Sequence, residues 1–247
     1  MSDFLNRISE NLRAEKIFAV ATRISGNENV GAHLFVYADG ALENTLGDAE
    51  LDARVRADAL TLMASERSET RAYDDAQIFI ETYSPPPRLL IVGGVHTAIP
   101  LTHYAKILGF RVTIVDGRGR FATRERFPHA DELIIEWPDD VIPRLLIDAS
   151  TYVVILTHDP KFDIPTLRAL STTKPRYIGA MGSRETRRQH MDELRAQRVP
   201  DEFLKTVYGP VGLDLGGRSP EEMALAIIAQ IVAVRYGHGG GHLKLDS

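Results

Sequence analysis

The chain has 247 residues, 44% of them hydrophobic and 26% charged, which is enough for one large soluble domain or two modest ones. Its formal net charge of -5 argues against broad binding to nucleic acid or to an anionic membrane surface. The sequence contains no cysteine, which excludes disulfides, thiolate metal sites and a nucleophilic cysteine in this chain. No apolar run is long enough to span a bilayer, and the charged segment 1–16 does not resemble a secretory signal. We therefore expect a cytoplasmic protein.

Residues 1–84 are predicted to form a small mixed α/β domain. Apolar residues at helical spacing from Phe4 to Leu12 predict a first helix, and Asp39-Gly40 between two apolar runs predicts a hairpin turn. Three consecutive prolines, 85–87, then interrupt regular structure and are read as a linker between domains 1–84 and 85–247. The expected elements of the first domain are strands at 16–24, 33–46, 68–73 and 76–84 and a second helix at 48–66.

Residues 85–247 alternate short apolar strands with amphipathic helices. This alternation predicts a Rossmann-like parallel sheet with helices on both faces. The last helix has the clearest start, because Ser219 suits the N-cap and Pro220 the first helical position. The predicted strands are 88–93, 111–116, 132–136, 151–157 and 176–181, and the predicted helices are 97–108, 138–147, 163–171, 183–197 and 220–236.

The segment 88–121 has the outline of a dinucleotide-binding strand, turn and helix. Gly93 is expected to make the tight turn and Ala98 is an accepted small residue at the third place, but Val95 replaces the second glycine. Its branched side chain is expected to crowd the approach of a pyrophosphate to the backbone. Asp116 ends the next strand, where an acid that binds a ribose hydroxyl is expected. The segment predicts a βαβ unit, and its ligand stays open between NAD(P), another phosphorylated molecule and none.

Histidines and acids follow two strands at the edge where open parallel sheets bind ligands. Thr157, His158 and Asp159 come directly after one strand, and His96 lies in the first strand-to-helix turn. A histidine at this edge can move a proton or hold a metal, and the alternative is a loop histidine facing solvent. The sequence assigns no metal ligand and no catalytic residue.

Two later loops are rich in glycine. Gly182, Ser183 and Arg184 lie between a strand and a helix, which is typical of an anion cradle and also of a simple capped turn. In "YGPVGLDLGGRSPEE", Asp214 and Arg218 are expected to reach a ligand. The mixed charges of "RETRRQHMDELRAQR" predict a helix face exposed to solvent.

Four segments taken together resemble the XdhC/CoxI family, which are accessory proteins for xanthine dehydrogenase and related molybdenum hydroxylases. They cover most of residues 88–234 in the order of the family. The matching segments are "LLIVGGVHTAIPLTHYAKILGFRVTIVDGRGRFATRERFP", "TYVVILTHDPKFDIPTL", "YIGAMGSRETR" and "GPVGLDLGGRSPEEMALAIIAQI".

The resemblance implies a maturation factor that binds the molybdenum cofactor, supports its sulfuration and delivers it to a molybdenum hydroxylase such as xanthine dehydrogenase. Such a protein is more a cofactor-binding chaperone than a catalyst. We also expect a homodimer, because the strands of a small first domain have edges that need covering, and no nucleic-acid or membrane partner. The positions expected around the cofactor are Gly93, Gly94, His96, Asp116, Arg118, Thr157, His158, Asp159, Gly182, Ser183, Arg184 and Asp214.

The first domain departs from the family pattern. The family has a glycine-serine-proline-arginine stretch after its first strand and a glycine-rich turn that ends in cysteine. This chain reads "ISGNENVGAHLFV" and "TLGDAELDARV" there, with Asp48-Ala49 in place of the glycine and cysteine. Any role that needs that thiolate, such as carrying sulfur, cannot be performed by this chain.

Two other functions remain open at this point. An NAD(P)-dependent oxidoreductase is favoured by the βαβ unit and Asp116 and disfavoured by Val95. A degenerate scaffold that binds no ligand is the third possibility.

Overall fold

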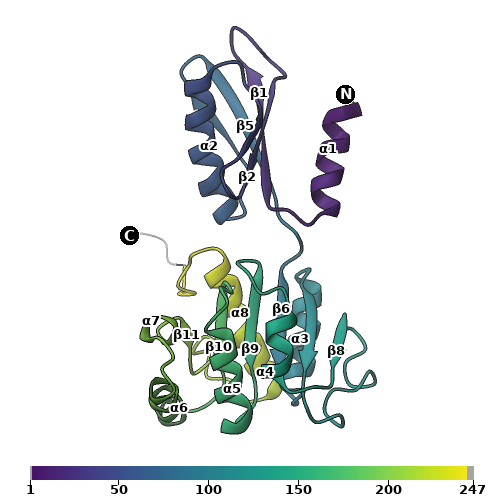
Figure 1. The fold of residues 1–247 in the computed structure, drawn as a ribbon, viewed down its shortest axis with the longest axis vertical. Coiled ribbons are helices and arrows are strands. Elements are labelled where there is room, and N and C mark those ends of the chain that lie inside the picture. The colour runs from purple at the N-terminus through teal and green to yellow at the C-terminus, as the bar shows by residue number, and fades with distance from the viewer. Residues whose placement is uncertain (1, 244–247) are drawn as a thin grey trace. The chain divides into compact units, whose positions relative to one another are not determined.

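The protein is described by a computed structural model that covers residues 2–243 and divides into two compact units between Pro85 and Pro86 (Figure 1). Met1 and residues 244–247, at the outer ends of the two expected domains, lie outside the described residues. Each unit has its own sheet and its own hydrophobic core. Within residues 2–243, no helix has the length and apolar character needed to cross a membrane.

The first unit is an antiparallel sheet with the strand order β3-β2-β1-β5-β4. Helices α1 and α2 lie on opposite sides of this sheet (Figure 1). The expected hairpin turn is present, since the Gly40 amide donates to the Tyr37 carbonyl at 2.8 Å. The bounds are α1 Ser2–Arg13, β1 Phe18–Ser25, β2 His33–Tyr37, β3 Leu42–Asn44, α2 Ala49–Ala64, β4 Glu69–Tyr73 and β5 Ala76–Tyr83.

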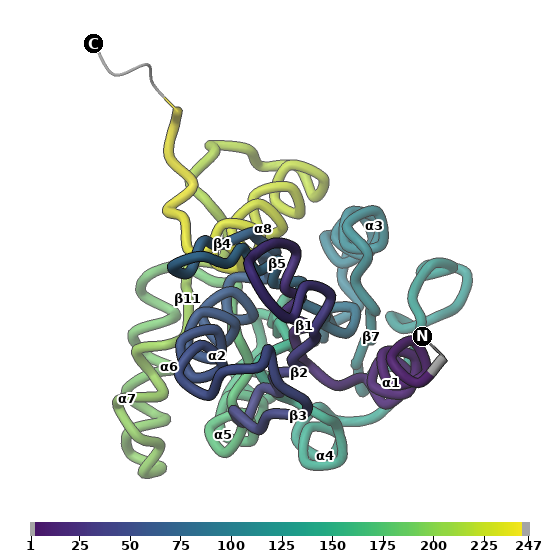
Figure 2. Tube along the Cα trace, turned by 90° about the horizontal axis from the view of Figure 1, so that it is seen from above, coloured from purple at the N-terminus to yellow at the C-terminus, as the bar shows by residue number. Residues whose placement is uncertain are grey.

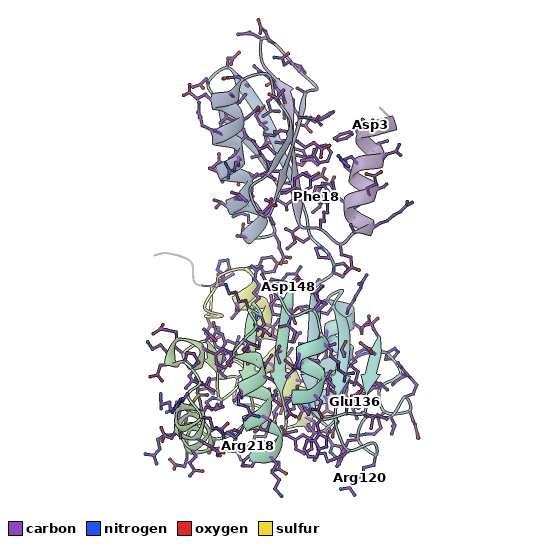
Figure 3. The ribbon with its side chains drawn as sticks, viewed as in Figure 1. Asp3, Phe18, Arg120, Glu136, Asp148 and Arg218 are labelled. Atoms are coloured by element: carbon purple, nitrogen blue, oxygen red, sulfur yellow. The ribbon has the colours of Figure 1, made fainter. Side chains whose placement is uncertain are left out.

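Strand β1 is buried on both faces because its side chains alternate between two cores. Ala19 and Ala21 face the core under α2, where small side chains let the helix approach closely. Phe18 packs in the smaller core on the side of α1 and stacks on Tyr83, with ring centroids 4.8 Å apart (Figure 3). The α1 side chains that reach this core include Phe4.

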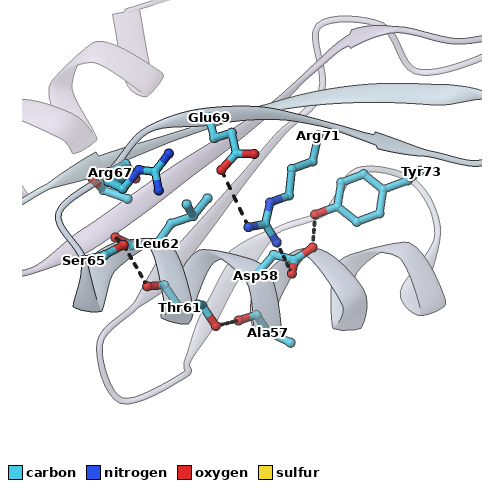
Figure 4. Close-up of polar contacts among 10 residues, drawn as sticks. Ala57, Asp58, Thr61, Leu62, Ser65, Arg67, Glu69, Arg71 and Tyr73 are labelled. Carbon is cyan, nitrogen blue, oxygen red and sulfur yellow. Dashed lines mark hydrogen bonds and ion pairs between the residues drawn. The ribbon is translucent and has the colours of Figure 1, made fainter. Parts of the chain in front are cut away.

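One carboxylate ties α2 to strand β4. Asp58, in the middle of α2, accepts hydrogen bonds from the Arg71 guanidinium and the Tyr73 hydroxyl (Figure 4). Glu69 lies 3.7 Å from the other terminal nitrogen of Arg71. Burial, followed by the hydrogen bond to Asp58, raises the pKa of Tyr73, so the phenol stays a donor at every physiological pH.

The second unit is an all-parallel sheet with the order β11-β10-β9-β6-β7-β8. This confirms the Rossmann-like sheet expected from the alternating pattern. Its elements are β6 Arg88–Val92, α3 Ala98–Ile107, β7 Arg111–Val115, β8 Glu132–Ile134, α4 Pro138–Val141, η1 Ile142–Arg144, β9 Thr151–Ile155, α5 Pro160–Leu170, β10 Tyr177–Ala180, α6 Arg184–Ala196, α7 Asp201–Leu204, β11 Val207–Tyr208 and α8 Pro220–Arg235.

Helices cover both faces of this sheet, as expected. Helices α3 and α8 pack on the face that carries Leu89 and Ile91, and α4, α5 and α6 pack on the face that carries Leu90 and Val92. Figure 2 shows α3 and α8 on one side and α4 and α5 on the other. The capping box at Ser219 is present, with Pro220 at the first position of α8.

The structure corrects the helix predicted at 138–147. It is a single α-turn, α4, followed by the 3₁₀ turn η1, and the backbone is extended at Leu145. Pro143 explains the early end, because it has no amide donor and its ring clashes with the preceding turn. Two short elements, α7 and β11, were not predicted, since segments of four and two residues carry no periodic signal.

The Asp58 contact gives a stability prediction for the first unit. Asp58→Ala should lower its unfolding free energy by about 1–3 kcal/mol, because two donors on β4 lose a charged acceptor in a half-buried site. Hydrogen exchange of the α2 and β4 amides in the full chain measures this. The matched control is Glu10→Ala on α1, which removes only an ion pair to Arg7 with a 64% exposed acid and should cost under about 1 kcal/mol. Equal losses in the two variants would contradict a structural role for Asp58.

Candidate functional site

The polar residues singled out in the sequence lie mainly at the carboxyl edge of the parallel sheet. Parallel pairing brings the ends of all its strands to one side, so the loops that follow β6, β7, β9, β10 and β11 share this edge. Figure 3 shows Arg120 and Arg218 at this end of the second unit and Asp148 at the opposite end. We call this end the carboxyl rim.

Close packing requires both glycines of the first turn. Gly93 has φ +103°, and a Cβ there would lie 2.8 Å from the Thr157 methyl carbon. A Cβ on Gly94 would lie 2.6 Å from the Phe121 carbonyl oxygen. Val95 is half-buried and packs against the core shared with α3 and α8. Because Gly93 and Gly94 have no side chains, the loops that carry Thr157 and Phe121 can pack directly against this turn.

The carboxylate of Asp116 fastens this turn to the next loop. Asp116 is fully buried, and its oxygens accept from the Gly94 amide, the Arg118 amide and two nitrogens of the Arg118 guanidinium, each at 2.9 Å. Burial favours the protonated acid, but the hydrogen bonds from Arg118 and Gly94 prevail and hold the pKa of Asp116 below its usual value. Asp116, the acid expected to bind a ribose hydroxyl, therefore uses its carboxylate oxygens to accept hydrogen bonds from protein groups. This arrangement does not support an NAD(P) site.

Arg118 is held on two further sides by aromatic rings. Its guanidinium lies 4.3 Å from the ring centre of Phe121 and 4.9 Å from that of Phe162. Trp137, the sole tryptophan of the chain, stacks on Phe162 with centroids 4.4 Å apart. About a third of the Arg118 side chain stays exposed at the rim. Arg118 thus joins the loop after β7 to the first turn of α5.

A second polar cluster, which the sequence did not reveal, lies behind the loop after β9. The Thr157 hydroxyl donates to Asp163 of α5, and the other oxygen of this acid lies 3.8 Å from Nδ1 of His190 on α6. All three residues are buried, and neither that second Asp163 oxygen nor Nε2 of His190 has a hydrogen-bond partner among the described residues. The available signal was a carboxylate on the buried face of an amphipathic helix.

The buried environment of this cluster favours the uncharged forms of Asp163 and His190. Burial raises the pKa of Asp163 to about 7, opposed by the Thr157 hydrogen bond and reinforced by the charge of Asp159. Burial also lowers the pKa of His190, with Glu193 acting in the opposite direction. Since both shifts disfavour charge, we describe the pair near neutral pH as a carboxyl group beside a neutral imidazole.

A cavity of about 640 Å³ opens at the rim between the loops after β9, β10 and β11. It brings together four of the residues expected around a cofactor: His158, Gly182, Ser183 and Asp214. Arg218, which was also expected to reach a ligand, lines the same cavity. The volume lies within the range of sites for drug-sized ligands. We call this space the rim cavity.

One wall of the rim cavity is the beginning of α6. Gly182 has φ +134°, and Ser183 caps the helix by accepting from the Thr186 amide at 3.0 Å. A helix start of this kind carries partial positive charge and free amides, which suit a phosphate or another anion. Thr186 and two methionines, Met181 and Met223, also line the cavity and were missed because nothing in their spacing marks them.

The remaining expected residues do not line the rim cavity. His96 is exposed in the turn before α3, and Asp159 is the N-cap of α5, where it accepts from the Lys161 amide at 3.0 Å. Arg184 lines a separate groove along α6. The expected set therefore divides into the four cavity residues and the others, which are Gly93, Gly94, His96, Asp116, Arg118, Thr157, Asp159 and Arg184.

In the first unit, Asp48-Ala49, which stands in place of the family's glycine and cysteine, has a structural use at the start of α2. Asp48 caps α2 by accepting from the Glu50 amide at 3.0 Å, and Gly47 before it has φ +100°. Asp52 fixes the same turn by accepting from the Leu46 amide at 2.9 Å. The turn before α2 is thus formed without a thiol.

The fold defines this chain as a two-unit α/β protein whose second unit has a Rossmann-like parallel sheet. The family described as "XdhC Rossmann domain" matches residues 89–231, and that described as "XdhC and CoxI family" matches residues 13–74. The chain therefore belongs to the XdhC/CoxI family.

Individual relatives agree with this assignment. A protein of Bacillus subtilis, named as a probable subunit of xanthine dehydrogenase, is 31% identical over 158 residues, which is 64% of this chain and 46% of the relative. The "Molybdenum cofactor insertion chaperone PaoD" of Escherichia coli is 33% identical over 89 residues, or 36% of this chain and 28% of the relative. The chain spans less than half the length of either curated relative.

A solved structure shares the fold. The crystal structure of a xanthine dehydrogenase from Bacillus halodurans superposes with a TM-score of 0.56 over 92% of this chain and 94% of that chain. The sequence identity is 22%, so the likeness concerns the fold alone.

Removal of the Asp116 carboxylate should destabilise the second unit. Asp116→Ala leaves the Gly94 amide and the Arg118 guanidinium without their acceptor, at a cost of about 3 kcal/mol in unfolding free energy. Urea unfolding measures the loss, and hydrogen exchange should show reduced protection of the Gly94 amide. Glu125→Ala, an exposed acid in the adjoining loop, is the control and should change stability by less than about 0.5 kcal/mol. An Asp116→Ala protein as stable as this control would refute the role of the carboxylate.

Asp163 should make stability depend on pH. Its folded pKa is about 7, above the ordinary value of 3.8, so between these values the folded state keeps a proton that the unfolded state has lost. This contribution to stability is complete below about pH 4 and is lost as the pH rises to about 7, by up to roughly 1.4 kcal/mol per pH unit. Asp163→Asn should remove this slope, so its stability relative to wild type should grow from pH 5 to 7 and then level off. Parallel stability curves for the two proteins would contradict a neutral buried acid.

Proposed function

We propose that this chain binds the molybdenum cofactor in the rim cavity and supports its sulfuration and insertion into a molybdenum hydroxylase of the xanthine dehydrogenase type. The observation that carries the proposal is the rim cavity itself, which is lined by the start of α6, Asp214 and Arg218. Membership of the XdhC/CoxI family supports this choice of ligand, as do the names of two relatives, a cofactor insertion chaperone and a xanthine dehydrogenase subunit.

The residues present suit the chemistry of the cofactor. Molybdopterin carries a phosphate, for which the Gly182–Ser183 helix start and the Arg218 guanidinium offer donors. Its pterin ring exposes an amino group and ring nitrogens, which a carboxylate such as Asp214 can accept from. When bound, the cofactor supplies the molybdenum centre, and the chain contributes positioning and protection from water.

The absence of a thiol limits the part that this chain can play in sulfuration of the cofactor. The chain has no cysteine, so the sulfur must arrive on another protein or molecule while this chain holds the cofactor. On this proposal the protein acts as a chaperone and not as a sulfur carrier. The receiving enzyme and a homodimer remain part of the proposal. The outer strands β3 and β4 of the first sheet, which pair on one side only among the described residues, support an association of this kind.

Binding of molybdopterin to cavity variants tests the proposal. Under anaerobic conditions, Asp214→Ala and Arg218→Ala should each weaken the affinity of the full chain by roughly tenfold, which is the loss of one charged hydrogen bond. Equilibrium dialysis or calorimetry measures this, and thermal stabilisation by the ligand should fall in parallel. Arg168→Ala, an exposed arginine on α5 outside the cavity, is the matched control for Arg218→Ala and should bind as wild type does.

Two results would contradict the proposal. Unchanged affinity in both cavity variants would place the ligand elsewhere or leave the protein as a scaffold. Micromolar binding of NAD(H) or NADP(H) together with hydride transfer to a carbonyl would favour an oxidoreductase.

A further inference from the structure

A second pocket, of about 480 Å³, lies between α6 and α7 and is lined mainly by cations. We call it the α6 groove. Its charged lining residues are Arg184, Arg187, Arg188, Arg195 and Lys205, with Asp201 as the single acid among the described residues that line it. The sequence pattern predicted a helix face exposed to solvent for this segment. The structure confirms this exposure for Arg184, Arg188 and Arg195, and it also places the arginines at helical spacing along one groove.

Two of these cations lack an acid within the described part of the chain. The Arg184 side chain has no hydrogen bond or ion pair with any residue from 2 to 243. Arg187 donates only to backbone carbonyls there, to Gly209 at 2.5 Å and to Val207. Burial lowers the pKa of Arg187, which reflects a charge that is partly removed from water without a counter-ion. An anion brought into the groove would therefore be attracted to positive charge that the chain leaves unbalanced.

The positions of Arg184, Arg187 and Arg188 near the beginning of α6 also favour an anionic partner. The first turn of a helix carries partial positive charge, so acids stabilise it and cations do not. Helix α6 nevertheless begins with Arg184 and has Arg187 and Arg188 at its fourth and fifth positions, with Glu185 as the acid of the first turn. Arg187 and Arg188 have partners within the chain, but the Arg184 side chain has none among residues 2–243. A cation in the first turn without a structural partner is typical of a binding surface.

Arg195 is paired with both Asp192 and Asp201, whereas the other two cations each hold one acid that can be exchanged. Arg188 pairs with Glu185 at 2.8 Å, and Lys205 pairs with Glu202 at 2.7 Å. Both pairs are well exposed, so each contributes less than about 1 kcal/mol and can open for a new partner.

The dimensions and the floor of the groove suit a polypeptide better than a single small anion. From Arg184 to Arg195 the cationic stripe is about 16 Å long at the rise of an α-helix, which matches roughly five residues of extended chain. Between the cations the lining includes the apolar residues Met191 and Leu204, which are buried with exposed fractions of 7% and 3%. An occupant should carry several carboxylates along its length and can place aliphatic side chains over this apolar floor.

We infer that the α6 groove is a docking site for an acidic, partly apolar segment of a partner polypeptide. This inference goes beyond the proposed function, because it requires no cofactor in the rim cavity. The two surfaces lie on different sides of the same helix start: Ser183 and Thr186 line the cavity, and Arg184 and Arg187 line the groove.

Fluorescence anisotropy with the full chain and a labelled peptide of alternating glutamate and leucine tests the inference. The peptide should bind, its glutamine counterpart should bind at least about tenfold more weakly, and salt from about 0.05 to 0.3 M should reduce the affinity. The double change Arg188→Glu and Lys205→Glu should weaken binding by tenfold or more, since it reverses two well exposed charges of the groove. The control Lys174→Glu, an exposed lysine outside the groove, should change affinity by less than about twofold.

A folding control and two alternative ligands distinguish the possible outcomes of this experiment. Circular dichroism and thermal melting establish that the double variant is folded, and Arg188→Glu alone replaces it if it is not. Equal binding of the glutamine peptide, or unchanged binding in the variant, would overturn the inference. Binding of inorganic phosphate or of anionic vesicles with the same arginine dependence, while the peptide fails to bind, would overturn it in favour of a small-anion or membrane site. Because the cofactor titration uses Asp214 and Arg218, either proposal can fail without the other.

Discussion

The rim of the second unit depends on one buried carboxylate. Asp116 has no exposed surface, yet it accepts hydrogen bonds from the turn after β6 and from Arg118 in its own loop. A buried charge of this kind is tolerated only when its acceptors are satisfied, and here four donors satisfy them. Arg118 then extends the connection to Phe162 of α5. The turn after β6, the loop after β7 and the start of α5 are thereby held in one arrangement.

This connection separates two parts of the rim. On one side the glycine turn, Asp116 and Arg118 mainly bind one another. On the other side lies the rim cavity, whose lining includes Ser183 and Asp214. Between them lies the Thr157–Asp163–His190 cluster, which places a carboxyl group with a pKa of about 7 behind the loop of His158. Rigid support next to an open polar cavity is the arrangement expected of a site that binds a ligand in a fixed orientation.

Much of the fold could be predicted because short sequence patterns for strands, turns and helix caps agree with the observed structure. The apolar strands, the Asp39-Gly40 turn and the capping box at Ser219 each have a short-range physical cause that the sequence displays. The helix expected over 138–147 failed at Pro143, where the cost of an internal proline outweighed the apolar spacing. The short elements α7 and β11 depend on tertiary contacts and give no periodic signal.

The site was harder to predict than the fold, because it depends on where side chains point. Position after a strand placed His158, Ser183 and Asp214 correctly at the carboxyl rim, and the structure brings them into one cavity. Position after a strand does not show that the Asp116 oxygens accept hydrogen bonds from the protein, because this depends on the donors of the neighbouring turn. Nor could it pair Asp163 with His190, which lie on different helices and meet only after folding.

A crystal structure of the chain with molybdopterin bound would test the central claim most directly. The account predicts density in the rim cavity, with the phosphate at the Gly182–Ser183 start of α6 and the pterin ring directed toward Asp214. Density at the Gly93–Gly94 turn or in the first unit, with the rim cavity empty, would contradict it.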